Sequence, residues 1–141
     1  MPVLDASVLV EYLASGEHAE AARERILAEP HTIWAPHLVD AEVGHALRRA
    51  VQLGELDAVA ATETLWHLAE LPLRRVSHEV LIRYAWELRE NVSFYDALYV
   101  ALAELLNQRL VTFDARLARA SGIQVEIEAE CVYGGADAKR G

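Results

Sequence analysis

Short apolar runs alternate along the chain with longer stretches in which apolar residues recur every three or four positions. The short runs predict strands at residues 3–4, 32–35, 73–76, 110–113 and 125–127. The longer stretches predict helices at residues 7–14, 17–29, 36–53, 55–70, 77–90, 93–107 and 114–120. Because helices separate the strands, the connections are crossovers. We therefore predict an α/β fold, with a short parallel sheet of four or five strands and helices on both of its faces.

The stretch at residues 97–106 differs from the other predicted helices, because nine of its ten residues are apolar. A helix that is apolar on nearly every side is surrounded by protein. Asp96 stands in its first turn, where a carboxylate is costly unless a cation, hydrogen bonds or the helix N-terminus offsets its charge. Asp96 is thus either half of a capping box with Ser93 or a functional acid.

Two further aspartates stand where short apolar runs end. Asp5 follows residues 3–4, and Asp114 follows residues 110–113. In open parallel sheets, ligands bind in the crevice beyond the carboxyl ends of the strands, so both side chains are candidates for one site. Each aspartate is also a good N-cap for the helix that follows it.

The helix predicted at residues 36–53 offers a fourth acid. At 100° per residue its apolar stripe leaves Asp40 and Glu42 near opposite margins. Periodicity alone does not choose between them, and either one also fits a solvated flank of the helix.

Four carboxylates in one crevice would repel one another and destabilise the fold unless they shared a divalent cation. Oxygen ligands without His or Cys suit Mg²⁺ or Mn²⁺. No two of the six histidines lie four residues apart, and the single cysteine, Cys131, cannot build a zinc site alone. The absence of a disulfide pair and of a long apolar stretch predicts a cytoplasmic protein that does not enter a membrane.

Four short motifs, in order along the chain, resemble those of the PIN-domain ribonucleases, and among them the VapC-type toxins of toxin–antitoxin systems. The motifs are Asp5-Ala6-Ser7, Pro36-x-Leu38 followed by Glu42-Val43 and Ala46-Leu47, Tyr95-Asp96-Ala97, and Thr112-x-Asp114-x-x-Leu117. The resemblance covers essentially the whole chain. The length of the chain predicts a single domain at residues 1–141, and the Gly-rich end at residues 134–141 is expected to form a frayed tail. The resemblance implies a PIN-like fold. It also selects Glu42 over Asp40.

The resemblance implies an endoribonuclease toxin that depends on Mg²⁺ or Mn²⁺. Its catalytic residues would be Asp5, Glu42, Asp96 and Asp114, and Asp5, Asp96 and Asp114 would ligate metal. The Ser7 and Thr112 hydroxyls would hold the carboxylates in place, although a helix cap and a plain strand residue are the alternative roles. The implied partners are an RNA substrate, a second copy of the chain in a homodimer, and a VapB-like antitoxin. That antitoxin would place an arginine against the acids.

The overall charge is unfavourable for an RNA substrate. Thirteen basic and 22 acidic residues give a net charge of −9, and two Mg²⁺ ions would leave −5. We therefore expect local arginines to contact the RNA backbone, or else to be solvated helix residues. The first candidates are Arg48, Arg49 and Arg116, and further candidates are Arg74, Arg75, Arg89 and Arg119. A structured RNA loop is a better target than bulk RNA.

Other functions remain open from the sequence. One is a housekeeping PIN nuclease that matures RNA or acts on DNA. Another is a non-catalytic subunit of a repressor complex, in which the acids only cap helices. Haloacid-dehalogenase-type phosphatases are excluded because Ser7 stands where their second aspartate would. They and phosphoreceiver domains also need a lysine near the phosphate, and the only lysine is Lys139 in the tail.

Overall fold

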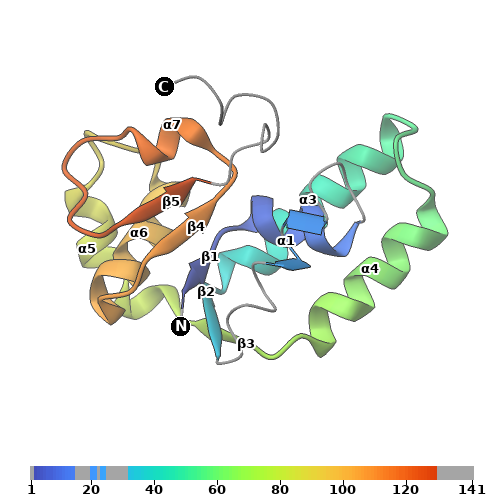
Figure 1. Cartoon of the computed structure of the whole chain (residues 1–141), viewed down its shortest axis with the longest axis horizontal. Coiled ribbons are helices and arrows are strands. Elements are labelled where there is room, and N and C mark those ends of the chain that lie inside the picture. The colour runs from blue at the N-terminus through green and yellow to red at the C-terminus, as the bar shows by residue number, and fades with distance from the viewer. Residues whose placement is uncertain (1, 15–19, 22, 25–31, 130–141) are drawn as a thin grey trace, which may run out of the picture.

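The computed structural model describes residues 2–14, 20–21, 23–24 and 32–129 (Figure 1). Of the helix predicted at 17–29, residues 20, 21, 23 and 24 are described, and they are helical. The predicted tail at 134–141 lies outside the described residues, as does Cys131.

The described chain forms a five-stranded parallel sheet with the order β3-β2-β1-β4-β5. Its strands are β1 (Val3–Leu4), β2 (Ile33–Pro36), β3 (Leu73–Val76), β4 (Leu110–Thr112) and β5 (Ile127–Ala129). This confirms the predicted parallel sheet. Along the chain, β2 and β3 are added on one side of β1, and β4 and β5 are then added on its other side. The carboxyl ends of β1 and β4 therefore flank a topological switch point, the usual place for a ligand in such sheets.

Helices flank the sheet. They are α1 (Ala6–Leu13), α3 (Leu38–Gln52), α4 (Ala58–Glu70), α5 (Ile82–Glu87), α6 (Phe94–Leu106) and the short α7 (Ala115–Ala118). Helix α6 packs on β1, β2, β4 and α5, while α1 packs on β4, α3 and α4. Figure 1 shows α3 and α4 as a hairpin that extends away from the sheet. The loop between them turns at Gly54, whose φ of 73° favours glycine.

Helix α6 confirms the prediction of a helix enclosed by protein. Residues 97–103 are all buried, and Ser93 caps the N-terminus as expected. The helix ends at Asn107, which adopts a left-handed conformation (φ 51°). In the part of the chain that the structure describes, no helix is both long enough and apolar enough to cross a bilayer.

The prediction of one helix over residues 77–90 is wrong. The segment is a 3-10 turn (His78–Val80) followed by the short α5, although Ser77 does cap its start. Leu81, Ala85 and Leu88 form the buried stripe that gave the helical pattern. Beyond Glu87 the N–H groups of Leu88 and Arg89 bond three residues back, to Ala85 and Trp86, so the helix tightens and ends.

The start of α3 also differs from the prediction. Pro36 belongs to β2, where it pairs with Val76, and the helix begins at Leu38. The backbone N–H of Leu38 donates to Nε2 of His78 at 2.9 Å, so a histidine from the segment after β3 satisfies a free donor at this helix end. Sequence position gave no sign of this contact, because the two residues are 40 positions apart.

Candidate active site

Asp5 is the most buried of the predicted acids, with 8% of its surface exposed. Its Oδ1 accepts the backbone N–H of Ser7 at 3.0 Å and the Ser7 hydroxyl, and its Oδ2 accepts the Thr112 hydroxyl. Burial raises the pKa of Asp5 to about 6 despite these bonds, and the nearby charge of Asp96 raises it further. Asp5 therefore carries a charge that its surroundings only partly stabilise.

The Ser7 and Thr112 hydroxyls link Asp5 to the loop that carries Asp114. Besides donating to Asp5, the Ser7 Oγ accepts the backbone N–H of Phe113 at 3.0 Å. Thr112 Oγ1 likewise accepts the backbone N–H of Asp114 at 2.9 Å. The loops after the adjacent strands β1 and β4 are thus held together through these two hydroxyls.

Glu42 lies on α3, and its Oε1 accepts the hydroxyl of Tyr99 at 2.6 Å. Burial raises the pKa of Glu42, and the charge of Asp96 adds to that rise. Burial also raises the pKa of Tyr99, and its hydrogen bond to Glu42 raises it further. The phenol therefore stays protonated and donates. Tyr99 was not among the predicted site residues, because it belongs to the apolar run of α6 and its hydroxyl does not show in that pattern. Its position three residues after Asp96, on the same face of α6, was the available signal.

Asp96 occupies the first turn of α6, where its backbone N–H donates to the Ser93 hydroxyl at 3.1 Å. Burial raises the pKa of Asp96, and the charge of Asp114 raises it further. The charge of Asp96 in turn raises the pKa values of Asp5 and Glu42. Asp96 is therefore electrostatically coupled to each of the three other predicted acids. We call the four residues Asp5, Glu42, Asp96 and Asp114 the acid cluster.

Asp114 caps α7 and accepts the backbone N–H of Arg116 at 2.9 Å. Burial pushes its pKa upward, but the backbone N–H and the guanidinium of Arg116 outweigh this effect and lower the pKa. The guanidinium Nε of Arg116 lies 3.4 Å from the Asp114 carboxylate, and this arginine is 87% exposed. The residue predicted to contact RNA therefore pairs with an acid of the cluster in this structure.

Asp40, the alternative to Glu42, is engaged elsewhere. Its carboxylate forms a bidentate pair with Arg75 of β3, with Nε to Oδ2 at 2.7 Å and an Nη to Oδ1 at 2.8 Å. Arg75 also donates to the carbonyl of Leu68 on α4. This pair ties α3 to β3 and α4, and of the two acids it is Glu42 whose pKa the charge of Asp96 raises.

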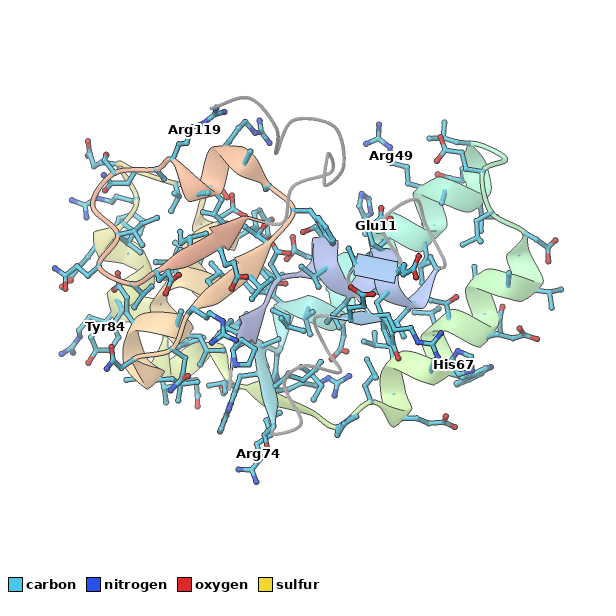
Figure 2. All side chains as sticks on the ribbon, in the orientation of Figure 1. Glu11, Arg49, His67, Arg74, Tyr84 and Arg119 are labelled. Atoms are coloured by element: carbon cyan, nitrogen blue, oxygen red, sulfur yellow. The ribbon has the colours of Figure 1, made fainter. Side chains whose placement is uncertain are left out.

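The other candidate arginines lie at the surface. Arg48 and Arg49 are exposed on α3, and Figure 2 shows Arg119 and Arg49 apart from each other along the upper edge, with Glu11 below Arg49. The Arg74 guanidinium stacks over Trp34, with 5.3 Å to the ring centroid, and Arg89 stacks over Trp86 at 5.1 Å. None of these observations assigns an RNA contact.

The donor set of the cluster suits a hard divalent cation, because it consists of carboxylate oxygens and three of the four pKa values are raised. Among the residues described, however, no three His, Cys, Asp or Glu side chains stand close enough together to hold an ion as they are placed. Glu42 is turned to Tyr99 and Asp114 to Arg116. Shared ligation therefore requires these side chains to reorient.

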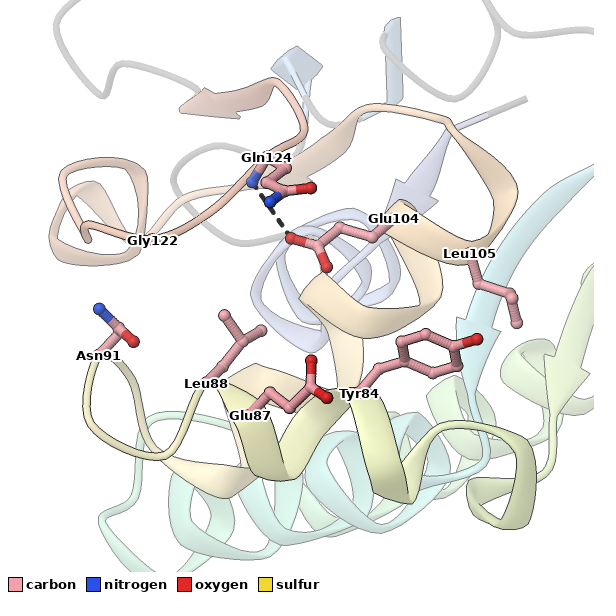
Figure 3. A pocket seen from close by; sticks show the side chains of 8 residues that line it. All are labelled: Tyr84, Glu87, Leu88, Asn91, Glu104, Leu105, Gly122 and Gln124. Carbon is pink, nitrogen blue, oxygen red and sulfur yellow. Dashed lines mark hydrogen bonds between the residues drawn. The ribbon is translucent and has the colours of Figure 1, made fainter.

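Two hollows of the described chain are lined in part by carboxylates. One, of about 360 Å³, adjoins the cluster and is lined by residues of α1 and α3 together with Phe113. The other, of about 550 Å³, lies between α5, α6 and residues 122–124 (Figure 3). There the Glu104 carboxylate accepts the backbone N–H of Gln124 at 3.1 Å.

The PIN-domain family model matches residues 3–123, which is most of the chain. The chain belongs to the PIN-domain family. This PIN domain is 50% identical over 127 residues to ribonuclease VapC1 of Mycobacterium tuberculosis, covering 89% of this chain and 95% of that protein. The family and the fold inferred from the four motifs are thus confirmed.

Two solved structures share the fold. The Mycobacterium tuberculosis VapC20 toxin, described as cleaving the sarcin–ricin loop, aligns with a TM-score of 0.69 at 18% identity over 88% of this PIN domain and 97% of the toxin. VapBC2 from Rickettsia felis, bound to a DNA fragment from its promoter, aligns with a TM-score of 0.63 at 18% identity. That match covers 89% of this PIN domain and 96% of the solved chain.

Proposed function

We propose that this PIN domain is an Mg²⁺- or Mn²⁺-dependent endoribonuclease of the VapC toxin type. The observation that carries the proposal is the electrostatic coupling of Asp96 to Asp5, Glu42 and Asp114 at the switch point of the sheet. Such coupling destabilises the protein unless a cation offsets it. The reaction class comes from the relatives named as ribonucleases.

In this proposal Asp5 and Asp96 are the direct metal ligands and Asp114 completes the set, while Glu42 orients the attacking water or holds a second ion. A bound divalent ion lowers the pKa of a water molecule and offsets charge on the scissile phosphate. Ser7 and Thr112 keep the Asp5 carboxylate in one orientation, and Tyr99 does the same for Glu42.

The test is expression of the wild-type chain and of the Asp96→Asn variant in a bacterial host, followed by mapping of RNA 5′ ends. We expect arrested growth and new RNA ends only when Asp96 is intact. The purified protein should produce the same ends with Mn²⁺ or Mg²⁺ and none with a chelator. New ends that also appear with Asp96→Asn would reject the assignment of the cluster as the catalytic centre.

A VapB-like antitoxin is the proposed inhibitor. The raised pKa values of Asp5, Glu42 and Asp96 mark a site in need of positive charge, and a bidentate arginine supplies it as a metal ion would. The isolated C-terminal tail of the antitoxin should therefore inhibit cleavage. An inhibition assay in which that tail has no effect, while the intact antitoxin does inhibit, would place its contact elsewhere.

We further propose a cytoplasmic homodimer. Large apolar side chains remain exposed next to one another on one face of α5, with Ile82 at 50% and Trp86, four residues later, at 59% exposed. Surfaces of this kind are commonly covered by partner proteins. Light scattering on the purified chain should give twice the monomer mass, and a monomer at micromolar concentration would contradict the dimer.

A further inference from the structure

Arg116 is a cation that lies against the acid cluster. It stands two residues after Asp114, and its Nε is 3.4 Å from Oδ1 of that carboxylate. Its charge lowers the pKa of Asp114 and counteracts the rise in the pKa of Asp96. One guanidinium therefore acts on two of the four acids, which come from different elements of the fold.

Other arginines considered for RNA contact have partners elsewhere. Arg75 is bound by Asp40, and the guanidinium groups of Arg74 and Arg89 each lie over a tryptophan ring. Within the described chain, the Arg116 side chain donates a hydrogen bond only to Asp114, through Nε, and its two Nη groups donate none. Because 87% of this side chain is exposed, the pair contributes little stability and is easily broken. Arg116 thus has free donors and a weak hold on its acid.

The proposed reaction brings a phosphate to the same place. If Asp114 helps to hold a divalent ion, the scissile phosphate that this ion neutralises lies next to Asp114 and so within reach of the Arg116 side chain. A planar guanidinium binds two phosphate oxygens at once through parallel N–H donors. An ion at Asp114 also repels Arg116, because both are positive. Binding of metal and RNA therefore favours a guanidinium on the phosphate over one on the carboxylate.

We propose that Arg116 is a catalytic residue that binds the scissile phosphate of the RNA, and that its pair with Asp114 holds it beside the site until the substrate arrives. This inference rests on the proposed nuclease function. The backbone of Arg116 does not need to move, because its N–H stays on Asp114 at 2.9 Å as part of the cap of α7. In a chain with a net charge of −9, a cation at the reacting phosphate matters more than its share of that total, since attraction between charges weakens with distance.

The test variants are Arg116→Gln and its matched control Arg119→Gln. Both remove one positive charge from the same short segment, and both sites are exposed. Arg119 forms no ion pair with a described residue, so only the first change removes a group that touches the acid cluster. The backbone cap of α7 is kept in both. A third variant, Arg116→Lys, keeps the charge but not the planar fork.

The first measurement compares two ligands of opposite charge. Fluorescence anisotropy with a short single-stranded RNA, in low salt with a chelator, should show about fivefold weaker binding by Arg116→Gln. The slope of log affinity against log salt should fall by about 0.7, the value for one lost phosphate contact. Differential scanning fluorimetry with Mn²⁺ alone should show binding at least as tight as in the wild type, because a like charge has left the site. Arg119→Gln should change both affinities less, and Arg116→Lys should restore the salt slope.

Two results of these titrations would overturn the proposal. Equal losses of RNA affinity in Arg116→Gln and Arg119→Gln would mean that only the net charge matters. Weaker Mn²⁺ binding by Arg116→Gln, with its RNA affinity unchanged, would mean that the arginine only positions Asp114.

A scan with methylphosphonate linkages identifies the phosphate that Arg116 contacts. Each RNA carries one uncharged linkage and is bound in the chelator buffer. For the wild type, neutralising the linkage that is cut in Mn²⁺ should weaken binding as much as Arg116→Gln does. The variant should be insensitive to that linkage, because the two changes remove the same contact. Equal sensitivity in the variant and the wild type would reject the contact.

Cleavage assays with Mn²⁺ separate this inference from the proposed function. At saturating RNA, Arg116→Gln should lower kcat about a hundredfold, the scale for loss of one donor to transition-state charge. If the wild type cuts RNA and Arg116→Gln cuts it equally fast, Arg116 is not catalytic and the nuclease assignment stands. If no RNA is cut but both affinities change as expected, the nuclease assignment fails and Arg116 remains a phosphate ligand.

Discussion

Two hollows in this protein both contain carboxylates, but only one has the electrostatics of an active site. The larger hollow, of about 550 Å³, is lined by Glu87 and Glu104, and there Glu104 holds the backbone of Gln124 (Figure 3). The smaller one adjoins the acid cluster, where burial and like charge raise pKa values. Glu104 is eight residues after Asp96 on α6, about 12 Å along the helix. Burial and mutual repulsion, rather than volume or the number of acids, distinguish the site.

The largest effect should come from matched carboxylate-to-amide substitutions on α6. Asp96→Asn should reduce RNA cleavage to background, because a proposed metal ligand is lost. The metal-free variant should be as stable as the wild type or more stable, because repulsion with Asp5, Glu42 and Asp114 is relieved. Glu104→Gln should keep full activity, since its side-chain oxygen still accepts from Gln124. Cleavage assays and urea denaturation with a chelator measure both effects.

If Asp96 were only a helix cap, both the expected loss of cleavage and the expected stability would differ. Asp96→Asn would then cleave RNA normally, and Asp96→Ala would lose about 0.5–2 kcal/mol of stability. Loss of activity in Glu104→Gln would show that the comparison between the two hollows is wrong.

The next effect is a dependence of stability on pH that originates in the acid cluster. Asp5 has a pKa of about 6 in the folded protein against 3.8 for the unperturbed group. Between these values the folded state binds more protons than the unfolded state, so the free energy of unfolding falls as the pH rises. At 1.36 kcal/mol per pKa unit, this shift lowers the free energy of unfolding by about 3 kcal/mol between pH 4 and pH 6. Glu42 and Asp96 act in the same direction, and Asp114, whose pKa is lowered, acts in the opposite direction.

Urea denaturation of the metal-free protein at several pH values measures this slope. Asp5→Asn should flatten the profile in that window, because the amide does not titrate. Glu104→Gln, in the other hollow, provides the control and should follow the wild type. An unchanged slope in Asp5→Asn would show that other groups cause the pH dependence.

Much of the fold was predictable because its determinants are local in sequence. The apolar runs of β1 and β4 end at Asp5 and Asp114, and Ser93 with the apolar residues after it defines α6. The end of α5 was not predictable, because the buried stripe of residues 81–88 continues past the point where the backbone tightens.

The contacts that complete the site were not predictable, because they join distant parts of the chain. Tyr99 reaches Glu42 over 57 positions, and Arg75 reaches Asp40 over 35. The latter pair engages Asp40 away from Asp96, whereas helical periodicity had left both acids of α3 as candidates. Tyr99 was also counted among the nine apolar residues at 97–106, so its hydroxyl was not considered as a hydrogen-bond donor.

A smaller effect is expected when a divalent ion is added to the folded protein. A ligand that binds only the native state at about 100 times its dissociation constant raises the free energy of unfolding by about 2.7 kcal/mol. Mn²⁺ should therefore raise the melting temperature of the wild type and of Glu104→Gln, but hardly that of Asp96→Asn. Differential scanning fluorimetry over a Mn²⁺ titration makes the comparison, and equal shifts in all three proteins would indicate ion binding outside the acid cluster.

The smallest effect should come from disturbing the larger hollow at Gly122. This residue has a φ of 78°, and a Cβ there would lie 2.9 Å from the side-chain nitrogen of Asn91. Gly122→Ala should therefore cost about 1–2 kcal/mol, mainly for the left-handed backbone. Adding Asn91→Ala should restore only the stability lost through the contact between the new Cβ and the Asn91 side chain, since the backbone at residue 122 keeps its conformation. Cleavage per folded molecule should equal that of the wild type, because the acid cluster is at the other end of α6. A fall in cleavage at full folding would show that α6 couples the two hollows, and their separate roles would have to be abandoned.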